Sequence, residues 1–216
     1  AKRTGEERVF SMPETCPVCG GKVVKPEGEA AARCSSPTCP AQLERGIEHF
    51  ASRDAMDITG FSEKTAAQLY DLCGIRDAAD LYQLSREQLL QLDGFKEKKA
   101  DNLLKALEKS RECTLDAFLF AIGIPNIGRG TARDIANHFG TLKAVMEADM
   151  DALLEIPDVG EIVAASVVEF FTYPENLDMV QRLLDAGVTP KHESGRLSEV
   201  LVGKTVVLTG TLPTLS

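Results

Sequence analysis

Four of the six cysteines have the spacing of metal ligands. Cys16 and Cys19 form a C-x2-C pair, Cys34 and Cys39 form a C-x4-C pair, and fourteen residues separate the two pairs. Each pair lies in a short segment rich in Pro, Gly or Ser, where a tight turn can bring two thiolates onto one tetrahedral ion. The sequence therefore predicts a four-cysteine zinc site within a segment too short to fold on its own apolar core.

This zinc site is predicted to be structural. Four protein ligands leave no coordination position open for water or a substrate, so catalysis by the metal is not expected. Two disulfides remain the alternative, which a reducing compartment disfavours. The other two cysteines, Cys73 and Cys113, lie in apolar stretches predicted to be helical, where packed thiols are ordinary.

A second pattern is a short turn that recurs at steps of 34, 32 and 32 residues. In each copy an apolar residue precedes the turn, a second apolar residue follows its centre, and an alanine comes four residues past its end. The copies are Ile58 to Ser62, Leu92 to Lys96, Ile124 to Gly128 and Ile156 to Gly160, followed by Ala66, Ala100, Ala132 and Ala164. Repetition of both spacing and residue class predicts one supersecondary unit used four times.

The residues of the turn are suited to meeting a phosphate. Glycine adopts a left-handed backbone freely and Asn or Asp tolerates it, and a helix that begins just after such a turn presents unpaired N–H groups. The pattern resembles the helix-hairpin-helix family of DNA-binding motifs that do not read sequence. The four hairpins are predicted near residues 58–66, 92–100, 124–132 and 156–164. A helical array that packs only on itself is the alternative.

Each copy keeps only one of the two glycines that a full hairpin of this family carries. The second and third hairpins have the most cations beside the turn, whereas Asp158 and Glu161 place carboxylates at the fourth. Lys64 gives weaker support to the first hairpin. The predicted DNA-binding residues are Gly60, Ser62, Lys64, Gly94, Lys96, Lys98, Lys99, Gly128, Arg129, Gly130, Arg133 and Gly160.

Composition limits the class of protein. The chain has 216 residues, 44% of them hydrophobic, and a formal net charge of −9. Residues 141–200 hold 12 Asp or Glu against 4 Lys or Arg, so the remainder is nearly neutral and can approach nucleic acid through backbone N–H groups. No apolar run approaches the roughly 20 residues of a membrane span, and the polar start does not resemble a signal peptide. A cytoplasmic protein without membrane contact is expected.

The expected fold is mainly α-helical, with four parts. Residues 1–45 form a lead-in and the zinc finger, 46–188 the helix-hairpin-helix domain, and 189–199 a linker. Helix starts are predicted at 85–87 and 148–151, where polar caps precede acidic residues. Residues 200–216 contain a β-branched run, GKTVVLTGTL, that looks like the truncated start of an α/β BRCT domain. An edge strand added to the preceding domain is the alternative.

Together these parts resemble the C-terminal half of a bacterial NAD-dependent DNA ligase. The similarity includes CPAQ at 39–42, AMDITGF at 55–61, ALEKS at 106–110 and IPDVG at 156–160. Such ligases adenylate a lysine from NAD, pass AMP to a 5′-phosphate and join the 3′-hydroxyl, in a nucleotidyltransferase domain with a Lys-x-Asp-Gly motif. That motif does not occur here. The resemblance therefore implies no catalytic residue in this chain, and NAD and Mg²⁺ used by a missing N-terminal domain.

The function that this resemblance implies is non-sequence-specific binding of nicked double-stranded DNA across the minor groove, for ligation during replication and repair. Expected partners are the DNA and the upstream oligonucleotide-binding and adenylation domains of the same polypeptide, with a monomeric chain. A stand-alone hairpin adaptor for repair or recombination is the alternative, and a base-excision glycosylase is disfavoured by four evenly spaced hairpins. His49, His138 and His192 have no partners at ligand or triad spacing.

Overall fold

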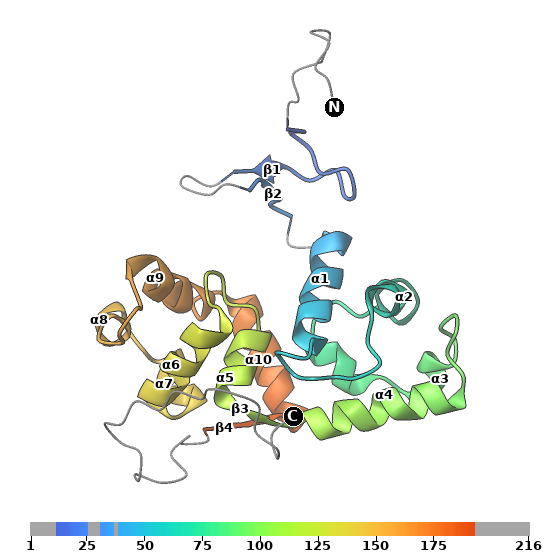
Figure 1. Cartoon of the computed structure of the whole chain (residues 1–216). Helices are drawn as coiled ribbons and strands as arrows, with labels where there is room; N and C mark the ends of the chain where they lie inside the picture. Colours follow the sequence, from blue (N-terminus) through green and yellow to red (C-terminus); the bar gives the residue numbers. More distant parts are fainter. Residues whose placement is uncertain (1–11, 26–30, 37–38, 193–216) are drawn as a thin grey trace, which may run out of the picture.

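The cysteine-containing segment is a small β-hairpin module, followed directly by a helical domain (Figure 1). The computed structural model describes residues 12–25, 31–36 and 39–192. Strands β1 (Val23–Val24) and β2 (Arg33–Cys34) pair antiparallel, with Val23 opposite Cys34. A single bridge joins Thr15 to Lys22. Two-residue strands cannot be stable alone.

The helical domain consists mainly of short helices, and the predicted mainly α-helical fold is confirmed. The first half contains α1 (Pro40–Ala51), α2 (Glu63–Cys73), the 3-10 helix η1 (Ala79–Gln83), α3 (Arg86–Leu89) and α4 (Glu97–Ser110). The second half contains α5 (Leu115–Ala121), α6 (Arg129–Phe139), α7 (Leu142–Met146), α8 (Met150–Leu154), α9 (Glu161–Phe170) and α10 (Pro174–Asp185). Strands β3 (Glu112–Thr114) and β4 (Thr189–Lys191) pair in parallel, below α5 in Figure 1.

Local chemistry explains where many helices begin. Ser85 starts α3 with a full capping box, in which its hydroxyl accepts from the Gln88 amide and the Gln88 side chain accepts from the Ser85 amide. The Asp149 carboxylate accepts from the Ala152 amide at the start of α8. Both starts were predicted from the sequence. Gly74 and Gly140 end α2 and α6 in the left-handed conformation that favours glycine.

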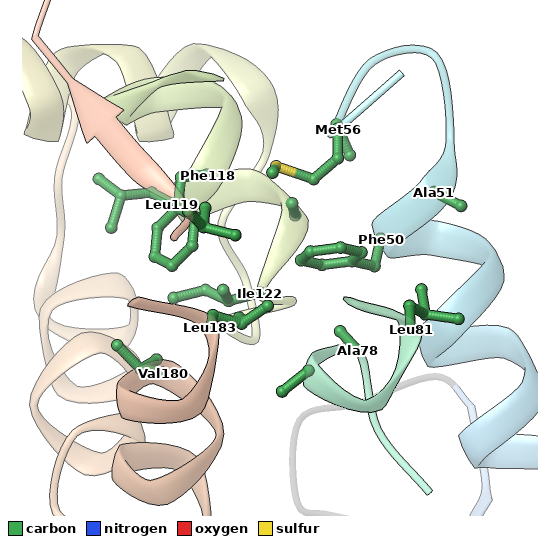
Figure 2. Packing of buried hydrophobic residues seen from close by; sticks show 14 of the residues in the cluster. Phe50, Ala51, Met56, Ala78, Leu81, Phe118, Leu119, Ile122, Val180 and Leu183 are labelled. Atoms are coloured by element: carbon green, nitrogen blue, oxygen red, sulfur yellow. The ribbon is translucent and has the colours of Figure 1, made fainter. Parts of the chain in front are cut away.

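One hydrophobic core joins the two halves. Figure 2 shows Phe50 and Leu81 of the first half facing the side chains of Phe118 and Leu183 of the second. All four of these side chains are at most 1% exposed, and they belong to a continuous cluster of buried residues. Burial of apolar area is the main favourable term in folding, so the two halves stabilise each other.

Polar contacts fix how the halves meet. The Nε2–H of His49 in α1 donates to the Phe120 carbonyl in α5 at 2.7 Å. The Arg182 guanidinium in α10 binds Asp77, two residues before η1, and Asp80 within η1, the second at 3.0 Å. These contacts, chiefly the hydrogen bond to Asp77, raise the pKa of Arg182 and keep it charged. His49, for which no role was predicted from the sequence, therefore links the two halves.

The structure departs from the sequence-based expectation in three places. The predicted linker 189–199 begins with strand β4, whose Thr189 amide donates to the Arg111 carbonyl at 2.7 Å. Helix α1 runs through the expected domain boundary at 45/46 without interruption. Cys113 lies in a strand rather than a helix, and its burial raises the pKa of this half-buried thiol to about 12. The predicted BRCT start at 200–216 lies outside the described residues.

The shared core predicts a position-dependent cost of truncating leucine. Leu119→Ala removes a side chain that is 1% exposed, and should lower the free energy of unfolding by about 2–5 kcal/mol. Leu72→Ala is the matched control, because Leu72 is 56% exposed, and its effect should stay within roughly 0.5 kcal/mol. Urea unfolding followed by circular dichroism measures both. Equal costs would contradict a core shared by the two halves.

Candidate metal centre and nucleic-acid interface

The four predicted metal ligands converge. The sulfur atoms of Cys16, Cys19, Cys34 and Cys39 all lie within 4.8 Å of one another. The Sγ atoms of Cys19 and Cys34 are 3.4 Å apart, and those of Cys16 and Cys39 are 3.9 Å apart. Thiolates around a tetrahedral zinc with Zn–S bonds of about 2.3 Å stand about 3.8 Å apart. The separations fit that geometry and exceed the S–S bond of about 2.05 Å, so a disulfide pairing is not formed.

Backbone groups support the cysteine cluster. The amide of Gly21 donates to Cys19 Sγ at 3.3 Å, and the amide of Ser36 donates to Cys34 Sγ at 3.4 Å. Such donors stabilise thiolates and orient them toward a metal. A Cβ at Gly21 would lie 2.9 Å from the Ser36 Cβ and within 3.3 Å of two cysteine sulfurs. Glycine is therefore required where the two turns approach each other.

The cluster also has an uneven proton affinity. Backbone hydrogen bonds from Cys19 and then Val18 lower the pKa of Cys16 to about 7. Burial raises the pKa of Cys39, the residue that immediately precedes helix α1. The Gln42 side chain, one turn into α1, donates to the Cys34 carbonyl. The metal centre and the first helix are thus joined through Cys39, which belongs to both, and through the Gln42 hydrogen bond.

The four repeated turns share one backbone geometry. The third residue of each turn has a positive φ: 87° at Gly60, 76° at Gly94, 62° at Asn126 and 63° at Asp158. The fifth residue is the N-cap of the next helix, with an extended backbone in every copy, at Ser62, Lys96, Gly128 and Gly160. Only the third position requires glycine, Asn or Asp. This explains why Ser and Lys can occupy the fifth position.

Packing makes the turns rigid. In each copy the apolar side chains at the first and fourth positions of the turn pack against the core. All of them are buried except that of Phe61, which is partly buried. The alanines four residues past the turns are all 0% exposed, and each of their amides donates to the carbonyl of the N-cap residue. A larger side chain at these alanines would force the two helices of a hairpin apart.

The hairpins are paired through their turns. In the first pair, the Gln68 side chain of α2 bonds both the amide and the carbonyl of Asp93 in the second turn. In the second pair, the Asn126 side chain in the third turn donates to Ser166 Oγ of α9 at 2.9 Å. Each pair therefore holds two turns in a fixed relation.

Three of the four helix starts leave their first amides open to an outside acceptor. Helices α4, α6 and α9 have no side-chain cap, whereas Ser62 Oγ accepts from the Thr65 amide in α2. The first amides of any helix have no intrahelical acceptor, and together they favour an anion. In the first hairpin Ser62 already accepts from one of these amides, whereas in the other three no side chain of the N-cap does so.

The structure places the predicted basic residues in two different settings. Lys96, Lys98 and Arg133 are exposed, and within the described residues no carboxylate pairs with them. By contrast, Lys64 Nζ lies 2.6 Å from Asp93 Oδ2, and Arg129 Nη1 lies 2.6 Å from Asp54 Oδ1.

These two exposed ion pairs were not predicted. The Lys64 ammonium, by hydrogen bond and then by charge, lowers the pKa of Asp93. Lys99 lies with Nζ 3.9 Å from the centre of the Phe95 ring. Exposed ion pairs are weak, so a phosphate can replace the carboxylate.

Sequence reasoning also missed cations away from the turns. Asn102, Lys105 and Lys109 of α4 line an open groove with Thr59 and Gly60 of the first turn. Together with Lys98, these three α4 residues follow one another at steps of four, three and four residues, which places them on one face of the helix. This spacing could have been recognised in the sequence.

The fourth hairpin differs in its surface. Asp158 and Glu161 are exposed around the turn, and Ile162 in the first turn of α9 is 74% exposed. Carboxylates beside the open amides oppose anion binding. This hairpin therefore offers less to a phosphate than the second and third.

The fold and site define a class: a four-cysteine zinc finger joined to two pairs of helix-hairpin-helix motifs. Residues 15–41 match the family described as the NAD-dependent DNA ligase C4 zinc finger domain. Residues 52–109 match a SAM-like helix-hairpin-helix tandem, and residues 117–180 match the helix-hairpin-helix motif. The two helical matches coincide with the two hairpin pairs.

Relatives point to one family of proteins. The chain is 47% identical over 98% of its length to a DNA ligase of Alkaliphilus metalliredigens, and 48% identical over 98% to one of Rubrobacter xylanophilus. A DNA ligase of Bacillus cereus is 44% identical over 98% of the chain. The chain spans about a third of these relatives, 32%, 31% and 32% respectively. The resemblance to NAD-dependent DNA ligases that the sequence indicated is thereby confirmed.

No helix in the described segments is long and apolar enough to cross a membrane.

The close approach at Gly21 predicts loss of the metal when a methyl group is added there. Gly21→Ala should reduce bound zinc well below one equivalent, because the added Cβ collides with Ser36 and with two ligand sulfurs. Gly46→Ala is the matched control, since a Cβ at Gly46 meets open space, and it should keep one equivalent. Metal analysis of the purified chains gives the readout. Full zinc occupancy in Gly21→Ala would contradict this account of the cluster.

Proposed function

We propose that this chain is the double-stranded-DNA-binding portion of an NAD-dependent DNA ligase and that it holds nicked duplex without reading its sequence. The observation that carries this proposal is that glycines occur at the starts of α6 and α9 although neither backbone conformation nor close packing requires them there. Gly128, Gly130 and Gly160 have no positive φ, and a Cβ at each would meet nothing within 4 Å. Gly128 and Gly160 are N-caps, but Gly130 lies within α6, where glycine costs about 1 kcal/mol relative to alanine. Space kept free beside open amides suits a partner whose backbone comes very close.

The proposed mechanism is binding of phosphate oxygens by the amides that begin α4, α6 and, more weakly, α2 and α9. Lys96, Lys98, Lys99 and Arg133 add charge beside these amides, and Lys64 and Arg129 exchange their carboxylates for phosphate. Because amides and ammonium groups contact the DNA backbone, they fix position and carry no sequence information. Paired turns, held together through Gln68 and Asn126, then grip both strands across the minor groove.

In the proposed assembly, catalysis and DNA binding belong to different parts of the polypeptide. Adenylation with NAD and Mg²⁺ and the joining of the nick belong to an N-terminal catalytic part, so this chain alone does not ligate. The proposed division is 1–45 for the lead-in and zinc finger, 46–188 for the DNA-binding domain, 189–199 for a linker and 200–216 for the BRCT start, with α1 crossing the first boundary and β4 opening the linker. In this proposal the chain is a cytoplasmic monomer that serves replication and repair, next to oligonucleotide-binding and adenylation domains.

The finger's proposed role is to set the angle between an upstream domain and the hairpins. Support comes from Cys39, which is both a predicted ligand and the N-cap of α1. A stand-alone adaptor for repair or recombination is the second candidate function. It uses the same hairpins, but the match of residues 15–41 to a ligase zinc finger favours the ligase.

The proposed function is tested by measuring duplex affinity over a range of salt. Log K should fall linearly with log salt concentration, and duplexes of equal length but unrelated sequence should bind within about twofold of each other. Fluorescence anisotropy with labelled duplexes gives both quantities. A strong preference for one sequence at fixed salt would overturn the proposal.

The ranking of the hairpins predicts unequal effects of single substitutions. Lys98→Glu and Arg129→Glu should weaken duplex binding by about tenfold or more, because each replaces a cation beside open amides with an anion. Glu161→Ala at the fourth hairpin should change affinity less. Lys143→Glu in α7 makes the same charge change as Lys98→Glu away from the four turns, and serves as the control. An effect of Lys143→Glu equal to that of Lys98→Glu would contradict the ranking.

A further inference from the structure

The outer face of α4 carries a row of polar side chains that the turns do not account for. Lys98, Asn102, Lys105 and Lys109 follow one another at steps of four, three and four residues, and all are exposed. Residues at this spacing share one face of a helix. The row covers eleven residue steps, or about 16 Å at 1.5 Å per residue. It runs from the start of α4, beside the second turn, to the end of α4 beside β3 (Figure 1).

The far end of this row meets the first hairpin. Asn102, Lys105 and Lys109 line an open groove whose other wall is Thr59 and Gly60, at the left-handed position of the first turn. Ala106 also lines the groove, and its side chain is small. The row and the groove therefore connect the turns of hairpins one and two along a single helix.

The acidic residues of α4 do not cancel this charge. Asp101 lies 2.7 Å from Arg86, Glu108 lies 2.7 Å from Arg111, and Glu97 lies 3.7 Å from Arg86. These acids sit one residue before Lys98, Asn102 and Lys109, which is about 100° away around the helix. In the described part of the chain, no ion pair joins Lys98, Lys105 or Lys109 to a carboxylate. The charge of the row is therefore available to an outside anion.

We propose that Asn102, Lys105 and Lys109, with the Thr59–Gly60 turn, form an additional phosphate-binding groove that guides one DNA strand between hairpins one and two. The occupant is the phosphate backbone of duplex DNA, because the cations from Lys98 to Lys109 are spread over about 16 Å, which equals roughly five base-pair steps of 3.4 Å along the duplex axis. An isolated small anion would need convergent donors instead. This inference rests on the proposed function and adds a site away from the hairpin amides.

Lys105 is the central member of the groove. Lys109 also borders a second pocket that contains Asp57 and Glu112, so part of its charge faces those carboxylates. Lys105 has no acidic neighbour in either pocket. We therefore expect Lys105 to contribute more than Lys109, and Asn102 to add a neutral donor between Lys98 and Lys105.

The test uses Lys105→Ala, Lys109→Ala and the double variant, with Lys143→Ala as a control of equal charge change in α7. For each variant the slope of log K against log salt is measured with one nicked duplex. Each phosphate contact contributes about 0.9 to that slope, so the double variant should lose about 1.8 and bind more weakly by up to about sixtyfold at 0.1 M salt. Lys143→Ala should leave the slope nearly unchanged.

Two outcomes separate the inference from the proposed function. If the unaltered chain does not bind duplex DNA, the proposed function fails. If it binds, but the double variant has the slope of Lys143→Ala, the groove is overturned while the hairpin amides stand. Thermal unfolding of each variant shows that the fold is retained, which is expected because both lysines are exposed.

Discussion

The whole helical domain depends on one backbone constraint, a reversal of the chain at a single residue with positive φ. Gly60, Gly94, Asn126 and Asp158 each take this conformation, and the next helix starts three residues later. The buried residues on either side leave the turn no freedom to relax, because they are fixed in the common core. The open amides are thus a consequence of packing. A site of this kind needs no long side chain to be ordered when it meets its ligand.

The sequence predicted these turns because their determinants are local. Residue type at the left-handed position, an apolar residue on each side and a distal alanine all lie within nine residues. The same holds for the cysteine cluster, where two short turns supply the ligands, and for the caps at Ser85 and Asp149. Local chemistry of this sort acts before any tertiary contact forms.

What the sequence could not predict depends on partners far apart in the chain. Strand β4 exists because β3, more than seventy residues earlier, offers it a parallel neighbour, so its polar sequence was interpreted as a linker. His49 lacked any ligand or triad spacing, yet its acceptor is the carbonyl of Phe120. The pairing of Arg129 with Asp54 is likewise visible only once α6 and the loop before the first hairpin lie together. Helix α1 spans the expected boundary at 45/46, because it follows directly on Cys39 of the finger and ends in the common core.

The continuity of α1 has a mechanical consequence. Cys39 contributes its sulfur to the cluster and is also the residue from which the helix departs, while Phe50 at the other end is locked among Leu81 and Phe118. The helix between them has 12 residues and is about 18 Å long. A rotation of the finger about Cys39 would therefore turn the start of α1 with it. Because Phe50 near the other end of α1 is packed in the common core, the same rotation would load the contact between the two hairpin pairs.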